Sequence, residues 1–150
     1  MSASAQRYVI DASVAIKWLF NDEEHTEEAV AALLALQAGR ITVVAPDHLH
    51  HEVASAIRTA TRMHRIAAAD ADATLQDFLQ IGIPLATGAG LVVAGLRSAI
   101  QYDCAYYDGL YLALAERADC PLLHADRRLR NTLAGRFLRE LWIEDFRLEP

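Results

Sequence analysis

The sequence has few of the residues that mark several classes of protein. Its 150 residues include two cysteines, four prolines and seven glycines, which excludes a disulfide framework and a fibrous chain. No run reaches the roughly 18 apolar residues of a membrane span, and the N-terminus lacks the basic-then-apolar order of a signal peptide. We therefore expect a cytoplasmic protein without membrane contact, in which Cys104 and Cys120 are reduced.

The residues that are abundant are typical of one globular domain. Hydrophobic residues make up 53% of the chain and charged residues 23%, so we expect residues 1–150 to fold as a single domain with a buried core. The net charge of −6 argues against a broad basic surface for nucleic acid. It does not exclude an enzyme that acts on nucleic acid, because cations bound by a cluster of acids reverse the local field.

Short apolar runs alternate with helical patterns along the chain. The predicted strands cover residues 8–10, 41–45, 83–86, 121–125 and 141–144, and the predicted helices cover 14–20, 24–38, 46–64, 67–80, 88–100 and 106–119. This alternation predicts an α/β fold in three layers, with a central, mainly parallel sheet flanked by helices. Sites in such folds lie beyond the carboxyl ends of the strands.

Four carboxylates are expected near that edge of the sheet. Asp11 and Asp126 each follow an apolar strand directly. Glu52 lies in the second turn of the helix predicted after the second strand, and Asp108 lies in the first turn of the helix that begins at residue 106. An acid at such a position is also a common helix N-cap, which is the simpler interpretation for any one of them. The set of four indicates a shared site.

Carboxylates that gather in one place repel each other, and cations relieve that repulsion. Ligands that offer only oxygen suit Mg²⁺ or Mn²⁺. Such an ion lowers the pKa of a water molecule and stabilises the leaving oxygen of a phosphodiester, so hydrolysis of nucleic acid is the leading inference. Sugar-phosphate hydrolases and other Mg²⁺ enzymes also carry acids at strand ends, so the pattern alone does not decide between them.

Four segments resemble the pattern of PIN domains, and particularly of the VapC-type toxins of bacterial toxin–antitoxin pairs. They are residues 9–14 (VIDASV), 49–53 (LHHEV), 107–115 (YDGLYLALA) and 122–129 (LLHADRRL), and they follow the family order across essentially the whole chain. The resemblance implies a PIN fold, Mg²⁺- or Mn²⁺-dependent endoribonuclease activity on RNA, a homodimer, and neutralisation by a cognate antitoxin protein.

The acidic positions of the family fall on Asp11, Glu52, Asp108 and Asp126. By this resemblance, Asp11 and Asp108 are direct metal ligands. Glu52 is a ligand or orients a metal-bound water, and Asp126 is a ligand or an acid just outside the ligand set. All four are our candidate catalytic and metal-binding residues.

Other residues are candidates for supporting roles. Ser13 matches a family position that commonly carries a small hydroxyl residue, although a helix N-cap is an equal alternative. His124 stands where the family often has threonine, and it could donate to a phosphate. Arginine side chains fit phosphate oxygens, so three arginines after Asp126 are candidate contacts to the RNA backbone, with a solvated turn as the alternative. These are Arg127, Arg128 and Arg130.

The histidines near Glu52 do not complete a zinc motif. His51 and Glu52 resemble the start of a metalloprotease helix, but that motif needs a second histidine four residues after His51, where Ser55 stands. We therefore expect His48, His50 and His51 to be exposed to solvent or to contact a partner.

Two other functions remain as alternatives to a metal-dependent endoribonuclease toxin. The first is a catalytically inactive PIN-like scaffold that only binds a partner. The second is a Mg²⁺-dependent phosphatase with an aspartate nucleophile, which normally has a second aspartate two residues after the first. Ser13 occupies that place after Asp11, which disfavours the phosphatase.

Overall fold

The sheet of the protein is parallel throughout. A computed structural model describes residues 4–148, and its five strands lie in the order β3-β2-β1-β4-β5. All neighbouring strands pair in parallel, and their bounds are β1 (Gln6–Ile10), β2 (Ile41–Pro46), β3 (Leu85–Ala86), β4 (Leu122–His124) and β5 (Glu140–Trp142). The predicted α/β class with a mainly parallel sheet is confirmed.

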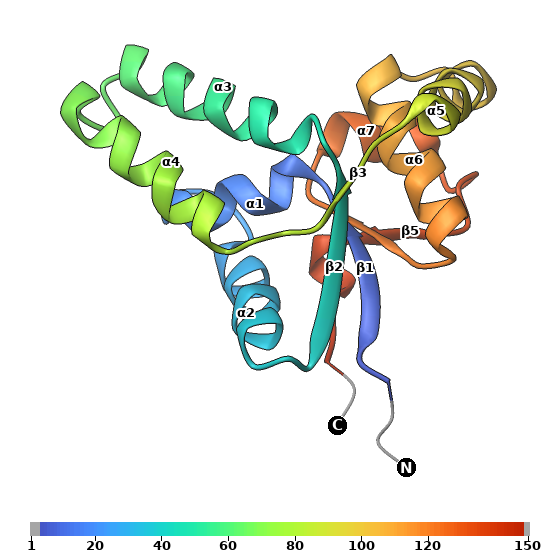
Figure 1. Cartoon of the computed structure of the whole chain (residues 1–150), viewed down its shortest axis with the longest axis horizontal. Coiled ribbons are helices and arrows are strands. Elements are labelled where there is room, and N and C mark those ends of the chain that lie inside the picture. Colours follow the sequence, from blue (N-terminus) through green and yellow to red (C-terminus); the bar gives the residue numbers. More distant parts are fainter. Residues whose placement is uncertain (1–3, 149–150) are drawn as a thin grey trace.

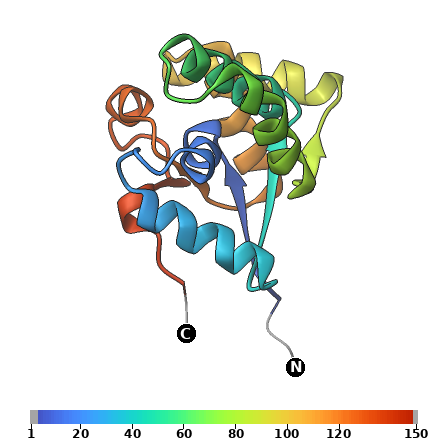
Figure 2. The ribbon, with the colours of Figure 1, turned by 90° about the vertical axis from the view of Figure 1, so that its left-hand side faces the viewer.

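Helices cover both faces of this sheet (Figure 1). One side carries α1 (Ala12–Leu19), α2 (Thr26–Gln37), α3 (Leu49–Arg62) and α4 (Ala71–Gln80), and the other side carries α5 (Ala89–Tyr102), α6 (Tyr106–Ala118) and α7 (Arg127–Leu133). Two short 3-10 helices cover Ala68–Asp70 and Ile143–Asp145. Figure 2 shows α1 and α2 in front of β1 and β2.

The side chains of β1 alternate between two hydrophobic cores. Tyr8 and Ile10 pack into the core under α1 to α4, whereas Val9 packs into the core under α5 to α7. Alternate residues of a strand point to opposite faces, so a strand that is covered on both sides is apolar at every position. This explains the uninterrupted apolar run that ends at Asp11.

The structure differs from the prediction in three short segments. Residues 127–133 form helix α7, which the sequence analysis did not predict. The hydrophobic pattern of this helix is weak, because only Leu129 and Leu133, four residues apart, are buried among exposed arginines. The strand predicted at 141–144 is instead β5 followed by a 3-10 helix, and β3 is reduced to two residues.

Helices α5 and α6 pack unusually close together next to Asp108. Gly109 lies against the backbone of α5, where an added Cβ would overlap the carbonyl oxygen of Gly95 and lie 2.9 Å from the backbone nitrogen of Ala99. The absence of a side chain at Gly109 thus lets the first turn of α6 approach α5. This contact fixes where Asp108 stands.

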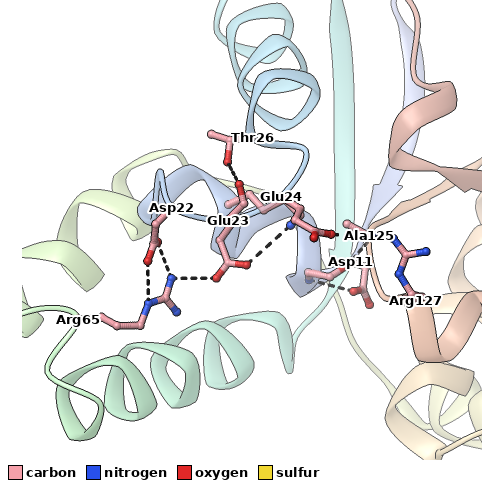
Figure 3. A network of polar contacts seen from close by, with 10 residues as sticks. Asp11, Asp22, Glu23, Glu24, Thr26, Arg65, Ala125 and Arg127 are labelled. Carbon is pink, nitrogen blue, oxygen red and sulfur yellow. Dashed lines mark hydrogen bonds and ion pairs between the residues drawn. The ribbon is translucent and has the colours of Figure 1, made fainter.

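An ionic network holds the loop between α1 and α2 (Figure 3). Arg65, which follows α3, donates to both carboxylate oxygens of Asp22 at 2.6 and 3.2 Å and to Glu23 at 3.0 Å. The Arg65 guanidinium also stacks over the ring of Phe20 at 4.7 Å. These contacts connect the end of α1 to the end of α3, so the helix that Asp11 caps is anchored at its far end.

No helix among residues 4–148 combines the length and the apolar character that crossing a membrane requires.

Candidate active site

The four predicted acids all lie at the carboxyl edge of the sheet. The Asp11 amide donates to the Leu123 carbonyl at 3.1 Å, and β1 pairs with β4 in parallel, so the chain leaves both strands at the same edge. Asp126 follows β4 and Asp108 is in the first turn of α6. Glu52 is in the first turn of α3, one turn earlier than predicted, because this helix begins only at Leu49.

Asp11 is buried and lies within electrostatic reach of Glu52. Its carboxylate accepts a hydrogen bond from the Ser13 amide at 2.9 Å, which makes Asp11 the N-cap of α1. Burial raises the pKa of Asp11 from 3.8 to about 6, and the charge of Glu52 also raises it, while hydrogen bonds from Ser13 oppose the rise. Asp11 is therefore both a cap and a buried acid with a neighbouring like charge.

Asp108 is linked electrostatically to two of the other acids. Burial raises the pKa of its carboxyl above 3.8, and the charges of Asp126 and Glu52 raise it further, whereas Arg128 and His48 lower it. Asp11 interacts with Glu52 and Glu52 interacts with Asp108. The four acids thus form one continuous chain of like-charge interactions.

The chemistry of these acids fits Mg²⁺ or Mn²⁺. Within residues 4–148, no three His, Cys, Asp or Glu side chains lie close enough to hold a metal ion jointly. The acids instead repel one another in pairs, and a cation would relieve that repulsion. Hard divalent ions usually keep several waters and take only one or two carboxylates each. The residues therefore fit an ion held by one or two carboxylates together with water.

Ser13 connects the ends of β1 and β4. Its hydroxyl oxygen accepts a hydrogen bond from the Ala125 amide at 2.8 Å, and the Ser13 side chain also hydrogen-bonds to Asp11. The N-cap of α1 is Asp11, so the alternative interpretation of Ser13 as that cap is wrong. Ser13 holds the segment before Asp126 beside Asp11, which is a supporting position at the site.

His124 lies inside the protein, so it does not reach a phosphate, and that expectation is corrected. Its side chain is fully buried, with Nε2 2.9 Å from Oε1 of Glu140 and with Nδ1 3.3 Å from the Asp126 amide that donates to it. Because Nδ1 accepts, we assign the ring proton to Nε2, which then donates to Glu140. The imidazole therefore holds the backbone amide of Asp126 in place through a hydrogen bond.

The three arginines after Asp126 lie on helix α7 and not in a solvated turn. Arg128 is 74% exposed, and its Nη2 is 3.5 Å from Oδ2 of Asp108 and 3.9 Å from Oδ2 of Asp126. Arg127 pairs with Glu24 at 3.9 Å (Figure 3), and the Arg130 guanidinium stacks over Trp142 at 4.6 Å. Arg128 is the arginine that lies nearest to the acids.

Sequence reasoning missed two side chains that contact Glu52. The Tyr111 hydroxyl donates to Oε1 of Glu52 at 2.9 Å, and Nε2 of His48 lies 2.8 Å from the same oxygen. His48 is buried against the rings of Tyr107 and Tyr111, which corrects the expectation that it is exposed or contacts a partner. The available signal was spacing, because Tyr111 follows Asp108 by three residues and so shares its helix face.

Several known proteins resemble this chain over most of its length. The PIN domain family model matches residues 8–133. VapC ribonuclease Mb0985 of Mycobacterium bovis and Ribonuclease VapC9 of Mycobacterium tuberculosis are each 32% identical over 124 residues, which cover 83% of this chain and 89% of each relative. The crystal structure of PAE2754 from Pyrobaculum aerophilum matches with a TM-score of 0.64 and 21% identity, over 93% of this chain and 92% of that one. That structural likeness concerns the fold alone.

Proposed function

Since this chain belongs to the PIN-domain family, within its VapC-type group, we propose that it is a metal-dependent endoribonuclease and the toxin of a toxin–antitoxin pair. One observation carries the proposal: four carboxylates from four distant segments lie at one edge of the sheet and interact as like charges. The names of the relatives supply the substrate class, which is RNA. We treat residues 1–150 as one PIN-like domain.

The four acids would have different roles at the reacting phosphodiester. Asp11 and Asp108, the two acids with raised pKa values, would hold Mg²⁺ or Mn²⁺. Such an ion lowers the pKa of the attacking water and offsets the negative charge that develops on the phosphate. Glu52 would orient that water, and Asp126 would add a carboxylate near Asp108. No covalent intermediate with the enzyme is needed.

The partners follow from the same proposal. RNA brings phosphates toward the acidic edge, where Arg128, with support from Arg127 and Arg130, contacts the backbone. A cognate antitoxin protein binds the toxin and neutralises it, and two copies of the chain form a homodimer. The protein would act in the cytoplasm, where its RNA substrate lies.

The direct test of this function compares acid-to-amide variants. Asp11→Asn and Asp108→Asn should abolish RNA cleavage, and EDTA should abolish it in the wild-type protein. Asp72→Asn, on the exposed face of α4, is the matched control and should cleave normally. Circular dichroism and thermal melting would show that each variant is folded.

Three results would contradict the proposal. Full activity of Asp11→Asn or Asp108→Asn would show that the substituted acid is not required for the reaction. Cleavage that is undiminished by EDTA would show that the reaction does not need a metal ion. If calorimetry detects no Mn²⁺ binding at millimolar concentration and no RNA is cleaved, the chain is instead an inactive PIN-like scaffold.

A further inference from the structure

Within residues 4–148, side chains contact only one of the two carboxylate oxygens of Glu52. Tyr111 donates to Oε1 at 2.9 Å, and His48 approaches Oε1 at 2.8 Å. The His48 contact has the distance of an ion pair but not the angle of a hydrogen bond, so Tyr111 provides the directed bond. No side chain among residues 4–148 makes a hydrogen bond or ion pair with Oε2 of Glu52.

The Tyr111 hydroxyl is also within electrostatic reach of Asp11. The charge of Asp11 and the backbone amide of Ala12 both act on this hydroxyl, so it is close to the start of α1 as well as to the side chain of Glu52. The Tyr111 ring is fully buried in the core under α5 to α7 and packs against His48 with centroids 4.8 Å apart. A hydroxyl on a ring that cannot move sets the position of whatever it bonds to.

We infer that Tyr111 is a positioning residue for Glu52, which it fixes through Oε1, so that Oε2 is left available to bind a metal ion or to orient its water. This inference rests on the proposed function. Helix α6 then contributes twice to the site, because Asp108 supplies a carboxylate and Tyr111, three residues later, orients the carboxylate of another helix. Glu52 itself is on a more open position, with 39% of its side chain exposed, so it needs such a restraint.

The test is a double-mutant cycle read out by Mn²⁺ affinity. Isothermal titration calorimetry would measure the dissociation constant of Mn²⁺ for the wild-type protein, Tyr111→Phe, Glu52→Gln and the double variant. Phenylalanine keeps the buried ring and removes only the hydroxyl. We expect Tyr111→Phe to weaken Mn²⁺ binding about tenfold, a typical effect for a partner of a metal ligand. In the Glu52→Gln background the same change should have little further effect.

Tyr102→Phe is the matched control. The Tyr102 ring is also buried, and its hydroxyl also faces a glutamate, Glu116, but Glu116 lies near the far end of α6. This variant should bind Mn²⁺ as the wild-type protein does. Cleavage assays should then show a lower kcat for Tyr111→Phe at saturating Mn²⁺, with kcat calculated per folded molecule from the folded fraction given by circular dichroism, so that general destabilisation is not counted as a loss of catalysis.

Failure of this inference and failure of the proposed function give different results. If Glu52→Gln weakens Mn²⁺ binding and cleavage but Tyr111→Phe changes neither, the function stands and the positioning role is wrong. Equal weakening by Tyr111→Phe in both backgrounds also overturns the role, because the hydroxyl would then act independently of Glu52. Absence of Mn²⁺ binding and cleavage in the wild-type protein would overturn the proposed function itself.

Discussion

Asp11 caps helix α1 and also lies buried beside another carboxylate, and these two placements act on its pKa in opposite directions. The hydrogen bonds from Ser13 stabilise the charged form, whereas burial and Glu52 destabilise it. Burial is the largest effect, so the pKa rises to about 6. Without a cation, the protein therefore loses stability when Asp11 ionises. We expect this behaviour of a carboxylate whose function is to bind a cation.

This conflict predicts a pH-dependent effect of Asp11→Asn on stability without metal. The folded pKa of about 6 exceeds the ordinary 3.8, so the stabilisation of folded wild type by protonated Asp11 is complete below pH 3.8 and is lost as pH rises through 6. Asn keeps the cap and carries no charge. In EDTA, Asp11→Asn should therefore gain up to about 3 kcal/mol relative to wild type near pH 7.5, and much less near pH 4.

Urea unfolding of both proteins at the two pH values measures this difference directly. The subtraction of wild type from variant cancels the titration of the other groups. Saturating Mn²⁺ should reverse the order at pH 7.5, because only the wild-type protein keeps the carboxylate. If the difference in unfolding free energy between Asp11→Asn and wild type is the same at pH 4 and pH 7.5, ionisation of Asp11 does not destabilise the folded protein.

Arg128 should contribute more to RNA binding than the other arginines of α7. Its guanidinium is exposed and lies 3.5 Å from Asp108, whereas Arg127 pairs with Glu24 and Arg130 stacks on Trp142. In the non-cleaving Asp11→Asn background, Arg128→Ala should weaken RNA binding several-fold and reduce the slope of log K against log salt by about 1. Arg117→Ala, near the other end of α6, is the control. If Arg128→Ala changes the slope no more than this control does, Arg128 does not contact the RNA backbone.

The positions of the acids could be predicted from the sequence, but the contacts around Glu52 could not. An acid that directly follows an apolar strand must lie at the carboxyl edge of the sheet, which places Asp11 and Asp126 without a structure. Tyr111 is different, because its hydroxyl meets Glu52 across 59 residues of sequence. His48 was judged by its type, as a polar residue near a helix start, and the aromatic rings that bury it come from another helix.

At the scale of elements, the packing of α5 against α6 decides where Asp108 stands. Gly109→Ala should destabilise the protein by about 1–3 kcal/mol, because the new methyl group meets the backbone of α5 at Gly95 and Ala99, which cannot move away easily. Displacement of α6 should also lower cleavage activity, since Asp108 immediately precedes Gly109 in the same helix. Thermal melting and the RNA cleavage assay together measure both effects.

Gly90→Ala on α5 is the control for this change. No atom lies within 4 Å of a Cβ at Gly90, so alanine there should be neutral or stabilise the helix by up to about 1 kcal/mol. If Gly109→Ala melts at the wild-type temperature with full activity, the close approach of α5 and α6 does not position Asp108.

The element that the sequence did not predict, α7, and the predicted strand that proved shorter than expected, β3, are both short and depend on tertiary contacts. Helix α7 has seven residues, of which two are buried, and its first hydrogen bond comes from the Leu129 amide to the Asp126 side chain. Strand β3 has only two residues, and it is a strand because it pairs with Ala45 and Pro46 of β2. The hydrophobic periodicity of such short segments carries too little information, whereas α6, which is buried over most of its length, was predicted within one residue.

At the scale of the whole molecule, helix α5 presents an exposed apolar row that fits the proposed homodimer. Val92, Leu96 and Ile100 follow one another at four-residue spacing, and Leu96 and Ile100 are 54% and 73% exposed. A row of this kind can pack against its own copy across a two-fold axis.

We therefore predict that Leu96→Glu and Ile100→Glu turn the dimer into a monomer, as measured by light scattering after size-exclusion chromatography. Met63→Glu, an equally exposed apolar position at the end of α3, should leave the dimer intact. A wild-type monomer, or a dimer that survives Leu96→Glu and Ile100→Glu together, would show that α5 does not hold two copies together.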